Sequence, residues 1–263
     1  MAKRAMRRAF AVGMVLAGLA AGMPGALARP AGYLSSDVLD VVAVLPPAPV
    51  AGEARYENDR AVFRVTRRFL GSPRWDLATR DARLGTAEML QAYGCAVGVT
   101  LSEQALPNLV QLVERASTDS AHAAGVAKEH FKRQRPFLID QGEICQPREE
   151  LAGSYDYPSG HTTRGWTWAA ILAELAPDRA TAILARGRSF GESRIVCGAH
   201  NASAVEAGRL TAASVLVVEH ANRDFQADLV RARTELEELR ADAGAPRPQG
   251  CDAEAALVAL PVF

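Results

Sequence analysis

The stretch PSGHTTRGWTWAAILAELAP, residues 158–177, decides how this chain folds. It opens with a Pro-Ser-Gly turn, shows helical spacing of apolar residues from 161 to 176, and stops at Pro177. Pro158 fixes the turn, Gly160 lets the backbone approach a ligand, and the first N–H groups of the helix point at an anion. The stretch therefore predicts a helix whose N-terminus takes part in binding.

The same helical spacing recurs on both sides of this stretch. It predicts helices over residues 55–70, 74–93, 103–116, 119–133, 178–190, 201–218 and 222–241. Residues 134–158 lack periodicity and contain several Pro and Gly, which predicts one long loop. Alternating strand patterns are nearly absent, and no repeat of fixed period is visible. We expect an all-α fold, with one compact helical domain over residues 55–263 after an irregular lead-in over residues 29–54.

The first residues predict a secretory signal peptide over residues 1–28. Basic residues precede the apolar run 9–21, and Ala26-Leu27-Ala28 offers a cleavage site. The apolar run is short for a membrane span, so an uncleaved anchor is the weaker alternative. We expect a periplasmic or secreted protein whose mature chain has no membrane span.

Cleavage would also change the balance of charge. It removes four of the 30 Lys and Arg and none of the 30 Asp and Glu, which leaves 26 against 30 and a formal charge of −4. A mildly acidic chain argues against nucleic acid or an anionic membrane as the main partner. We expect small-molecule partners, and a homo-oligomer stays open.

Four cysteines lie in the mature part, which in an exported protein predicts two disulfides with three possible connectivities. No CxxC spacing is present, which argues against a zinc site. Cys145 and Cys197 each lie close to a candidate site string, so their pairing would tie two loops together. This favours Cys145–Cys197 with Cys95–Cys251.

Three strings could carry chemistry: KEHFKRQRP at 128–136, PSGH at 158–161 and SRIVCGAH at 193–200. The Arg side chains offer planar donor forks for a phosphoryl group, and Lys adds a point charge. The bland alternatives are a solvated basic helix end, an ordinary helix cap at Ser159 and histidines satisfied by water. The phosphate-binding candidates are Lys128, Arg135, Ser159, Gly160 and Arg194, with Arg133 as a further cation. The catalytic candidates are His161 and His200.

In this order, K-x6-RP, PSGH and SR-x5-H resemble the three-part signature of the type 2 phosphatidic acid phosphatase and vanadium haloperoxidase superfamily. Within it, the chain is similar to the bacterial class A non-specific acid phosphatases, over roughly residues 45–240. Similar context includes Gly153-Ser154-Tyr155 before PSGHT and Val196-Cys197-Gly198. Three ordered motifs are a far stronger signal than any one of them.

The resemblance implies an all-α, metal-independent phosphatase that acts on phosphate monoesters. It implies that His200 attacks phosphorus and forms a phosphohistidine, while His161 gives a proton to the leaving alcohol. The five phosphate-binding candidates would hold the equatorial oxygens, where charge gathers in the transition state. It implies no cofactor, although phosphate or vanadate could occupy the site.

One position departs from the family pattern, which ends in H-x3-D. Here Ala204 stands where an acidic residue would bond the nucleophilic histidine and fix its tautomer. Glu206 points roughly to the other side of an ideal helix, whereas Asn201, Glu192 or a backbone carbonyl could serve instead. Two alternatives to an active phosphatase therefore stay open: a phosphate- or vanadate-binding pseudoenzyme of the same fold, and a vanadium haloperoxidase.

Overall fold

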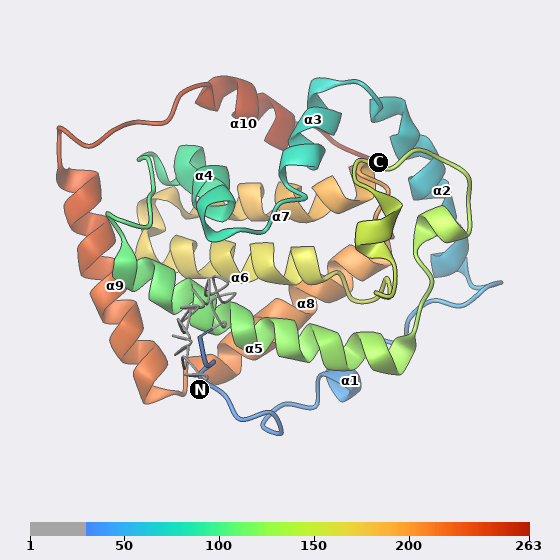
Figure 1. Cartoon of the computed structure of the whole chain (residues 1–263), viewed down its shortest axis with the longest axis horizontal. Coiled ribbons are helices and arrows are strands. Elements are labelled where there is room, and N and C mark those ends of the chain that lie inside the picture. Colours follow the sequence, from blue (N-terminus) through green and yellow to red (C-terminus); the bar gives the residue numbers. More distant parts are fainter. Residues whose placement is uncertain (1–29) are drawn as a thin grey trace, which may run out of the picture.

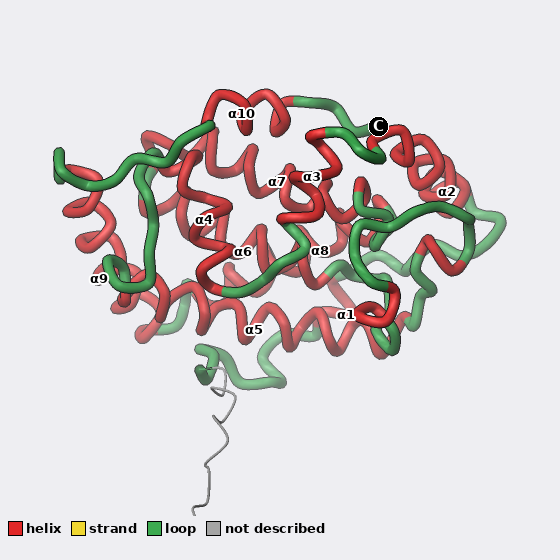
Figure 2. Tube along the Cα trace, turned by 45° about the horizontal axis from the view of Figure 1, so that its top comes forward, coloured by secondary structure: helices red, strands yellow, loops and turns green. Residues whose placement is uncertain are grey.

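A computed structural model describes residues 30–263, and the signal peptide expected over 1–28 lies outside these residues. All regular structure in the described part is helical, which confirms the all-α prediction (Figure 1, Figure 2). Among these residues, no helix is both long and apolar enough to cross a membrane. The helices are α1 Val41–Val44, α2 Ala54–Thr66, α3 Pro73–Arg80, α4 Thr86–Val97, α5 Pro107–Phe131, α6 Gly160–Leu175, α7 Ala180–Val196, α8 Ala202–Glu219, α9 Arg223–Ala241 and α10 Cys251–Ala259.

Helix α6 is the centre of the fold, and it packs against α5, α7 and α8 (Figure 1). Its Trp168 is fully buried, and the indole N–H donates to Ser117 Oγ on α5 at 3.1 Å. Close approach of the neighbours depends on glycine. A Cβ at Gly187 on α7 would lie 2.4 Å from the Ala169 side chain, and one at Gly208 on α8 would lie 2.7 Å from the Ser159 carbonyl oxygen. The start of α6 therefore lies directly against α8.

Helix α5 shows where the periodicity prediction was wrong. The expected helices 103–116 and 119–133 form one continuous helix from Pro107 to Phe131. Pro107 occupies its first turn, where a missing N–H costs nothing. Ser102 caps only a preceding turn, in which its Oγ accepts from Ala105 N at 3.2 Å. Lys128 lies in the last turn of this long helix and lines the pocket described below.

The expected helix over 74–93 is two helices, α3 and α4, because a turn at residues 81–85 interrupts it. Ser72 caps α3 by accepting from Trp75 N, and Pro73 fills its first position. Short helices inside the lead-in (α1) and near the C-terminus (α10) were not predicted. The long loop 134–158 is present, although it contains two 3₁₀ turns, Pro136–Leu138 and Arg148–Leu151.

Both disulfides have the favoured pairing, Cys95–Cys251 and Cys145–Cys197. The first ties α4 to α10. The second ties the long loop to the end of α7, where Cys145 N also donates to Cys197 O at 3.0 Å. The loop after α5 is thus fastened to the segment that leads to His200.

Buried polar contacts hold the lead-in against the helices. The Tyr33 N–H donates to Asp119 Oδ2 at 2.6 Å on α5, and its hydroxyl donates to Asp228 Oδ2 at 2.7 Å on α9. Close to this contact, at the end of α8, Glu219 is fully buried. The Asp119 side chain lies within hydrogen-bonding reach of its carboxyl group, and a hydrogen bond between two carboxyl groups needs a shared proton. Burial, and then the neighbouring Asp119, raise the pKa of Glu219 to about 9.

Candidate active site

The three strings meet at one pocket of about 590 Å³, formed where α5 ends and α6 begins. Lys128 comes from the last turn of α5, and Arg135 from the loop that follows. Gly160 and His161 open α6, and His200 lies in the short connection between α7 and α8. All five of these predicted site residues line the pocket. Helix packing thus brings together residues that are up to 72 positions apart.

Hydrogen bonds fix the tautomer of His200, which is only 2% exposed. Its Nδ1 lies 2.7 Å from the Asp156 backbone carbonyl, which can only accept, so Nδ1 carries the proton. On the other side, Arg135 Nη1 lies 3.0 Å from Nε2 and can only donate. Nε2 therefore holds the lone pair. Both contacts select the neutral imidazole with its nucleophilic nitrogen on the Arg135 side.

His161 has the opposite arrangement. Its Nε2 lies 2.9 Å from the Ala82 backbone carbonyl and must donate to it, which leaves Nδ1 free to exchange a proton. Burial, followed by the charge of Arg194, holds the pKa of His161 well below its ordinary value. Burial and Arg135 do the same to the pKa of His200. Both shifts favour the neutral form of the imidazole.

Three cations surround the histidines: Arg135 and Arg194 are buried, and Lys128 is partly exposed. Burial lowers the pKa of Lys128 to about 7 and that of Arg194 to about 9, and the charge of Arg135 adds to both effects. Burial also lowers the pKa of Arg135. Like charges held this close in a dry site destabilise one another. A bound dianion would relieve that repulsion, so the site favours an anion electrostatically.

Arg194, at the end of α7, has N–H groups without a hydrogen-bond partner among the described residues. The side chain is fully buried, and Nη2 donates to Gln146 in the long loop. Its Nε and Nη1 have no partner within residues 30–263. Buried guanidinium donors are rarely left unpaired in native proteins. Each of these unpaired N–H groups can donate to an anionic oxygen.

Three predicted cationic or polar residues do not line the pocket: Arg194, Arg133 and Ser159. Arg133 pairs with Asp59 at 2.7 Å and donates to Ser203 Oγ at 2.6 Å, so it ties α2 to α8. Ser159 is fully buried and caps α6, accepting from Thr162 N at 3.3 Å and from its hydroxyl at 3.0 Å. The amides of Gly160 and His161 have no acceptor among the described residues, so they are open to an anion.

The carboxylate that the sequence seemed to lack is Asp156. Its Oδ1 lies 3.0 Å from His200 Nδ1, beside the carbonyl contact of the same residue. Of the groups considered from sequence, a backbone carbonyl was correct, and Asn201 contacts Asp156 rather than the histidine. Glu192 pairs with Arg188, and Glu206 with Arg209. Asp156 was missed because it lies in an aperiodic loop, 44 residues before His200.

The outer wall adds residues that sequence reasoning did not single out. Arg164 Nη2 pairs with Glu114 Oε1 at 2.5 Å, and Thr86 Oγ1 donates to the same oxygen at 2.8 Å. Arg164 follows His161 by three positions, so both lie on one face of α6. That spacing was the available signal. All three of these polar side chains line the pocket.

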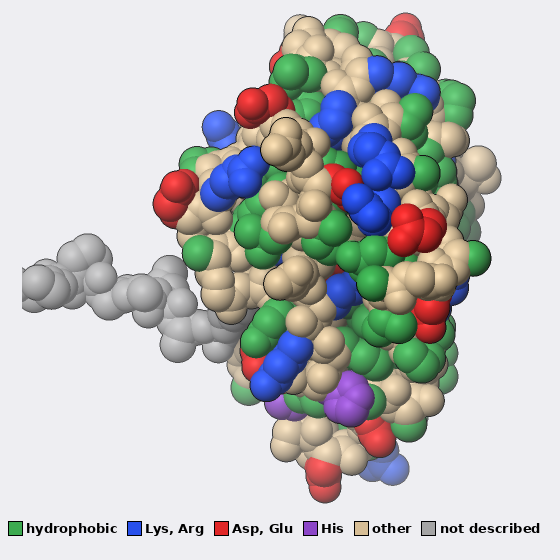
Figure 3. All heavy atoms as spheres, turned by 90° about the vertical axis from the view of Figure 1, so that its right-hand side faces the viewer, with side chains coloured by type: hydrophobic (Ala, Val, Ile, Leu, Met, Phe, Trp, Pro, Cys, Tyr) green, Lys and Arg blue, Asp and Glu red, His purple; other side chains and the backbone are tan. Residues whose placement is uncertain are grey.

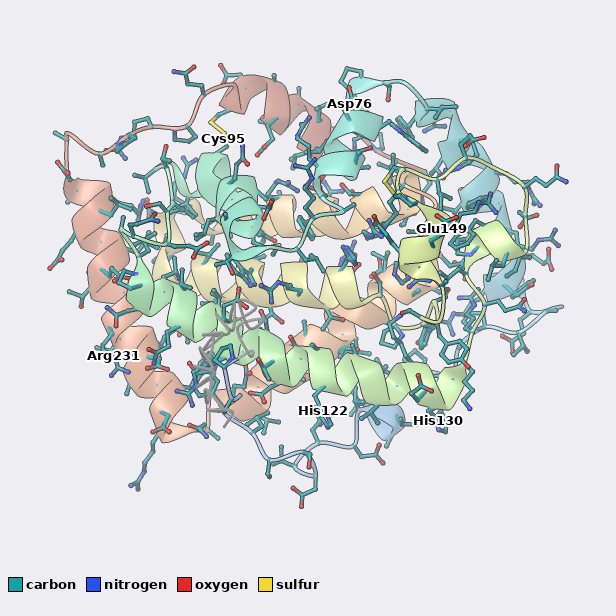
Figure 4. The ribbon with its side chains drawn as sticks, viewed as in Figure 1. Asp76, Cys95, His122, His130, Glu149 and Arg231 are labelled. Atoms are coloured by element: carbon teal, nitrogen blue, oxygen red, sulfur yellow. A yellow bond between two sulfur atoms is a disulfide. The ribbon has the colours of Figure 1, made fainter. Side chains whose placement is uncertain are left out.

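The remaining histidines are apart from this pocket. Figure 4 shows His122 and His130 on the side of α5 that faces away from α6. His220 pairs with Glu174 at 2.9 Å. On the face seen in Figure 3, basic side chains alternate with acidic and apolar ones.

Comparisons with known proteins agree with this geometry. Residues 113–226 match the family described as "PAP2 superfamily". An acid phosphatase of Zymomonas mobilis is 44% identical over 217 residues, which cover 82% of each chain. A non-specific acid phosphatase of Providencia stuartii is 33% identical over 78% of this chain and 84% of its own. Another from Salmonella typhimurium is 33% identical over 73% of this chain and 78% of its own.

Proposed function

We propose that this chain, which belongs to the acid phosphatases of the PAP2 superfamily, is exported and hydrolyses phosphate monoesters through a phosphohistidine at His200, without a metal ion. The observation that carries the proposal is the tautomer of His200. A neutral imidazole whose lone pair faces the cationic side chains of the pocket is a nucleophile next to an anion site. The two disulfides support export, because such bonds persist in oxidising compartments.

Binding is assigned to Lys128, Arg135, Arg194 and the N-terminal amides of α6. These donors would hold the equatorial oxygens of the phosphoryl group, where charge is greatest in the transition state. Arg135 would exchange its hydrogen bond to His200 for one to the substrate. Because this concentration of positive charge repels divalent cations, the side chains themselves do the work for which other phosphatases use metals.

In the first step, the Nε2 lone pair of His200 forms a bond to phosphorus and the bond from phosphorus to the ester oxygen breaks. The leaving oxygen takes a proton from Nδ1 of His161. The bound dianion raises the pKa of His161, which supplies the protonated form needed for this transfer. In the second step, water gives a proton back to His161 and its oxygen bonds to phosphorus. The bond from phosphorus to Nε2 then breaks, which releases phosphate.

Trapping the intermediate tests the proposal. The protein is mixed with a radiolabelled phosphate monoester, quenched in alkali within milliseconds, reduced and digested with trypsin. We expect an acid-labile, alkali-stable label in the peptide 195–209, whose single histidine is His200. The peptide 149–164, which contains His161 alone, is the internal control. Phosphate binding without ester turnover would identify a pseudoenzyme instead, and turnover without label in peptide 195–209 would refute the intermediate.

The pH dependence should have an alkaline limit set by Lys128. Its pKa is lowered to about 7, so the cation is present below this pH and is lost above it. We expect kcat/KM for p-nitrophenyl phosphate to fall as the pH rises through this value. A Lys128→Arg variant should keep its charge and move the limit upward by at least about one pH unit, whatever its absolute rate.

The matched control is Lys132→Arg, the same change at an exposed position of the following loop. It should leave the profile unchanged. The measurement is kcat/KM from about pH 4 to about pH 9 for all three proteins. An alkaline limit that is identical in wild type and Lys128→Arg would assign the limit to another group.

A further inference from the structure

A carboxylate bonds the nucleophilic histidine from an unexpected direction. Position 204, one helical turn after His200, holds an alanine that is fully buried in an apolar cluster with Tyr157, Ala207 and Val215. Asp156 instead reaches His200 from the loop before α6. The neighbouring Tyr157, also fully buried, fills apolar space beside Ala204. One dipeptide thus supplies both the carboxylate and the side chain that packs in the cluster around Ala204.

All side-chain contacts of Asp156 come from donors. Oδ1 lies 3.0 Å from His200 Nδ1 and accepts from Asn201 N at 3.1 Å. Oδ2 accepts from Asn201 Nδ2 at 2.8 Å and lies 3.5 Å from Arg133 Nη1. A protonated carboxyl would have to direct its own hydrogen at one of these donors. Burial raises the pKa of the Asp156 carboxyl, whereas the charge of Arg133 and the hydrogen bonds from Asn201 lower it. The donor geometry fits the ionised form, with its charge beside the histidine ring.

The loop that carries Asp156 is itself anchored. The Asp156 N–H donates to Arg133 O at 2.9 Å, and Arg133 is held by the buried Asp59. Asp59 also accepts from Ser203 N at 2.9 Å at the start of α8. The positions of Asp156 and of the segment after His200 are thus coupled through one buried polar network. Such support gives a histidine–carboxylate contact the rigidity that catalysis needs.

From this geometry we propose that Asp156 is the positioning residue for His200 and does the work of the acidic residue that position 204 lacks, an inference that rests on the proposed function. The residue acts twice. Its backbone carbonyl holds the tautomer, and its carboxylate stabilises the positive charge that the imidazole acquires when Nε2 bonds to phosphorus. The two contributions are separable, because a side-chain substitution leaves the carbonyl in place.

The variant Asp156→Asn tests the carboxylate alone. It keeps the carbonyl contact and an acceptor for Asn201 N but removes the charge. We expect kcat to fall about 10²-fold. The loss should be smaller than in an enzyme whose orienting Asp side chain alone fixes the histidine tautomer, because the Asp156 carbonyl still fixes it here. KM and inhibition by phosphate should change by less than about threefold, because no donor to the substrate is lost.

The matched control is Asn201→Ala, which removes the hydrogen bond to Oδ2 and leaves the charge in place. It should cost less than about tenfold in kcat. If Asp156 served only to hold Asn201 and the start of α8, the two variants would lose activity equally, which would overturn the proposal. Unchanged kcat in a folded Asp156→Asn protein would also overturn it. Absence of turnover in the wild type would refute the phosphatase mechanism itself, which is a different result.

Two further measurements do not depend on how well Asp156→Asn folds. Nitrogen NMR of the wild type should show His200 protonated at Nδ1, and protonation at Nε2 would contradict the proposal. The variant Ala204→Asp should gain no activity and should melt at a lower temperature, because it buries a charge in the apolar cluster. A gain in kcat of tenfold or more there would mean that His200 lacks an orienting carboxylate in the wild type.

Discussion

Replacing His200 with alanine is expected to lower kcat/KM for phosphate monoesters by at least ~10⁴-fold, the largest effect on activity that this structure implies. The substitution removes the atom that would bond to phosphorus. It leaves Lys128, Arg135 and Arg194 in place, so the affinity for inorganic phosphate should stay within a few-fold. The measurement is steady-state hydrolysis beside competitive inhibition by phosphate.

His161→Ala separates the two histidines, because its effect should depend on the leaving group. With an alkyl phosphate, whose alkoxide needs a proton, we expect a loss of about 10²–10⁴ in kcat. With p-nitrophenyl phosphate the loss should be much smaller, since nitrophenolate leaves unprotonated. His122→Ala, on the far side of α5, is the control and should match wild type on both substrates. Equal losses of His161→Ala on the two esters would remove His161 from the acid role.

Glu219→Gln is expected to give the largest gain in stability. The pKa of the buried carboxyl is raised from 4.5 to about 9, so the folded protein keeps a proton that the unfolded chain releases. The stability is therefore greatest below the unfolded pKa and falls as the pH rises toward the folded one. Between about pH 5 and pH 7 the loss is on the order of 3 kcal/mol. Glutamine is neutral throughout, so this slope should disappear.

Urea unfolding at several pH values measures the effect directly. The variant should exceed wild type by a margin that grows from acid to neutral pH. Glu206→Gln, on the exposed face of the same helix, is the matched control and should leave the slope unchanged. A wild-type stability that stays flat across this range would show that Glu219 is ionised in the folded protein, with a partner that compensates its charge.

Periodicity was enough to predict the helical class and most helix positions, because an amphipathic helix repeats its pattern within a few residues. It failed at element ends. The two segments predicted for residues 103–133 join into α5. The polar residues 117–120 do not interrupt the backbone hydrogen bonds of this helix, and Ser117 accepts a hydrogen bond from Trp168. The turn at 81–85 was not predicted, because the helical spacing of apolar residues continues across it.

The three strings sufficed to predict which side chains would meet, since five of the candidates line one pocket. The sequence did not predict hydrogen-bond partners that the loops bring together from distant parts of the chain. Asp156 has no periodic neighbour and contacts a residue 44 positions away. Ser159 shows a different limit, because a helix cap and a phosphate ligand have the same sequence signature. Only the geometry shows that its oxygen accepts from the first turn of α6.

The hydrogen bond from Arg135 also protects His200. The guanidinium donates to the lone pair of a ring that is 2% exposed. Stray electrophiles and dissolved metal ions would have to displace a buried arginine before they could react with the imidazole. An anionic oxygen would offer the guanidinium a better acceptor than the ring nitrogen and would take over this hydrogen bond. In the proposed mechanism, the side chain that would bind the substrate therefore also shields the nucleophile.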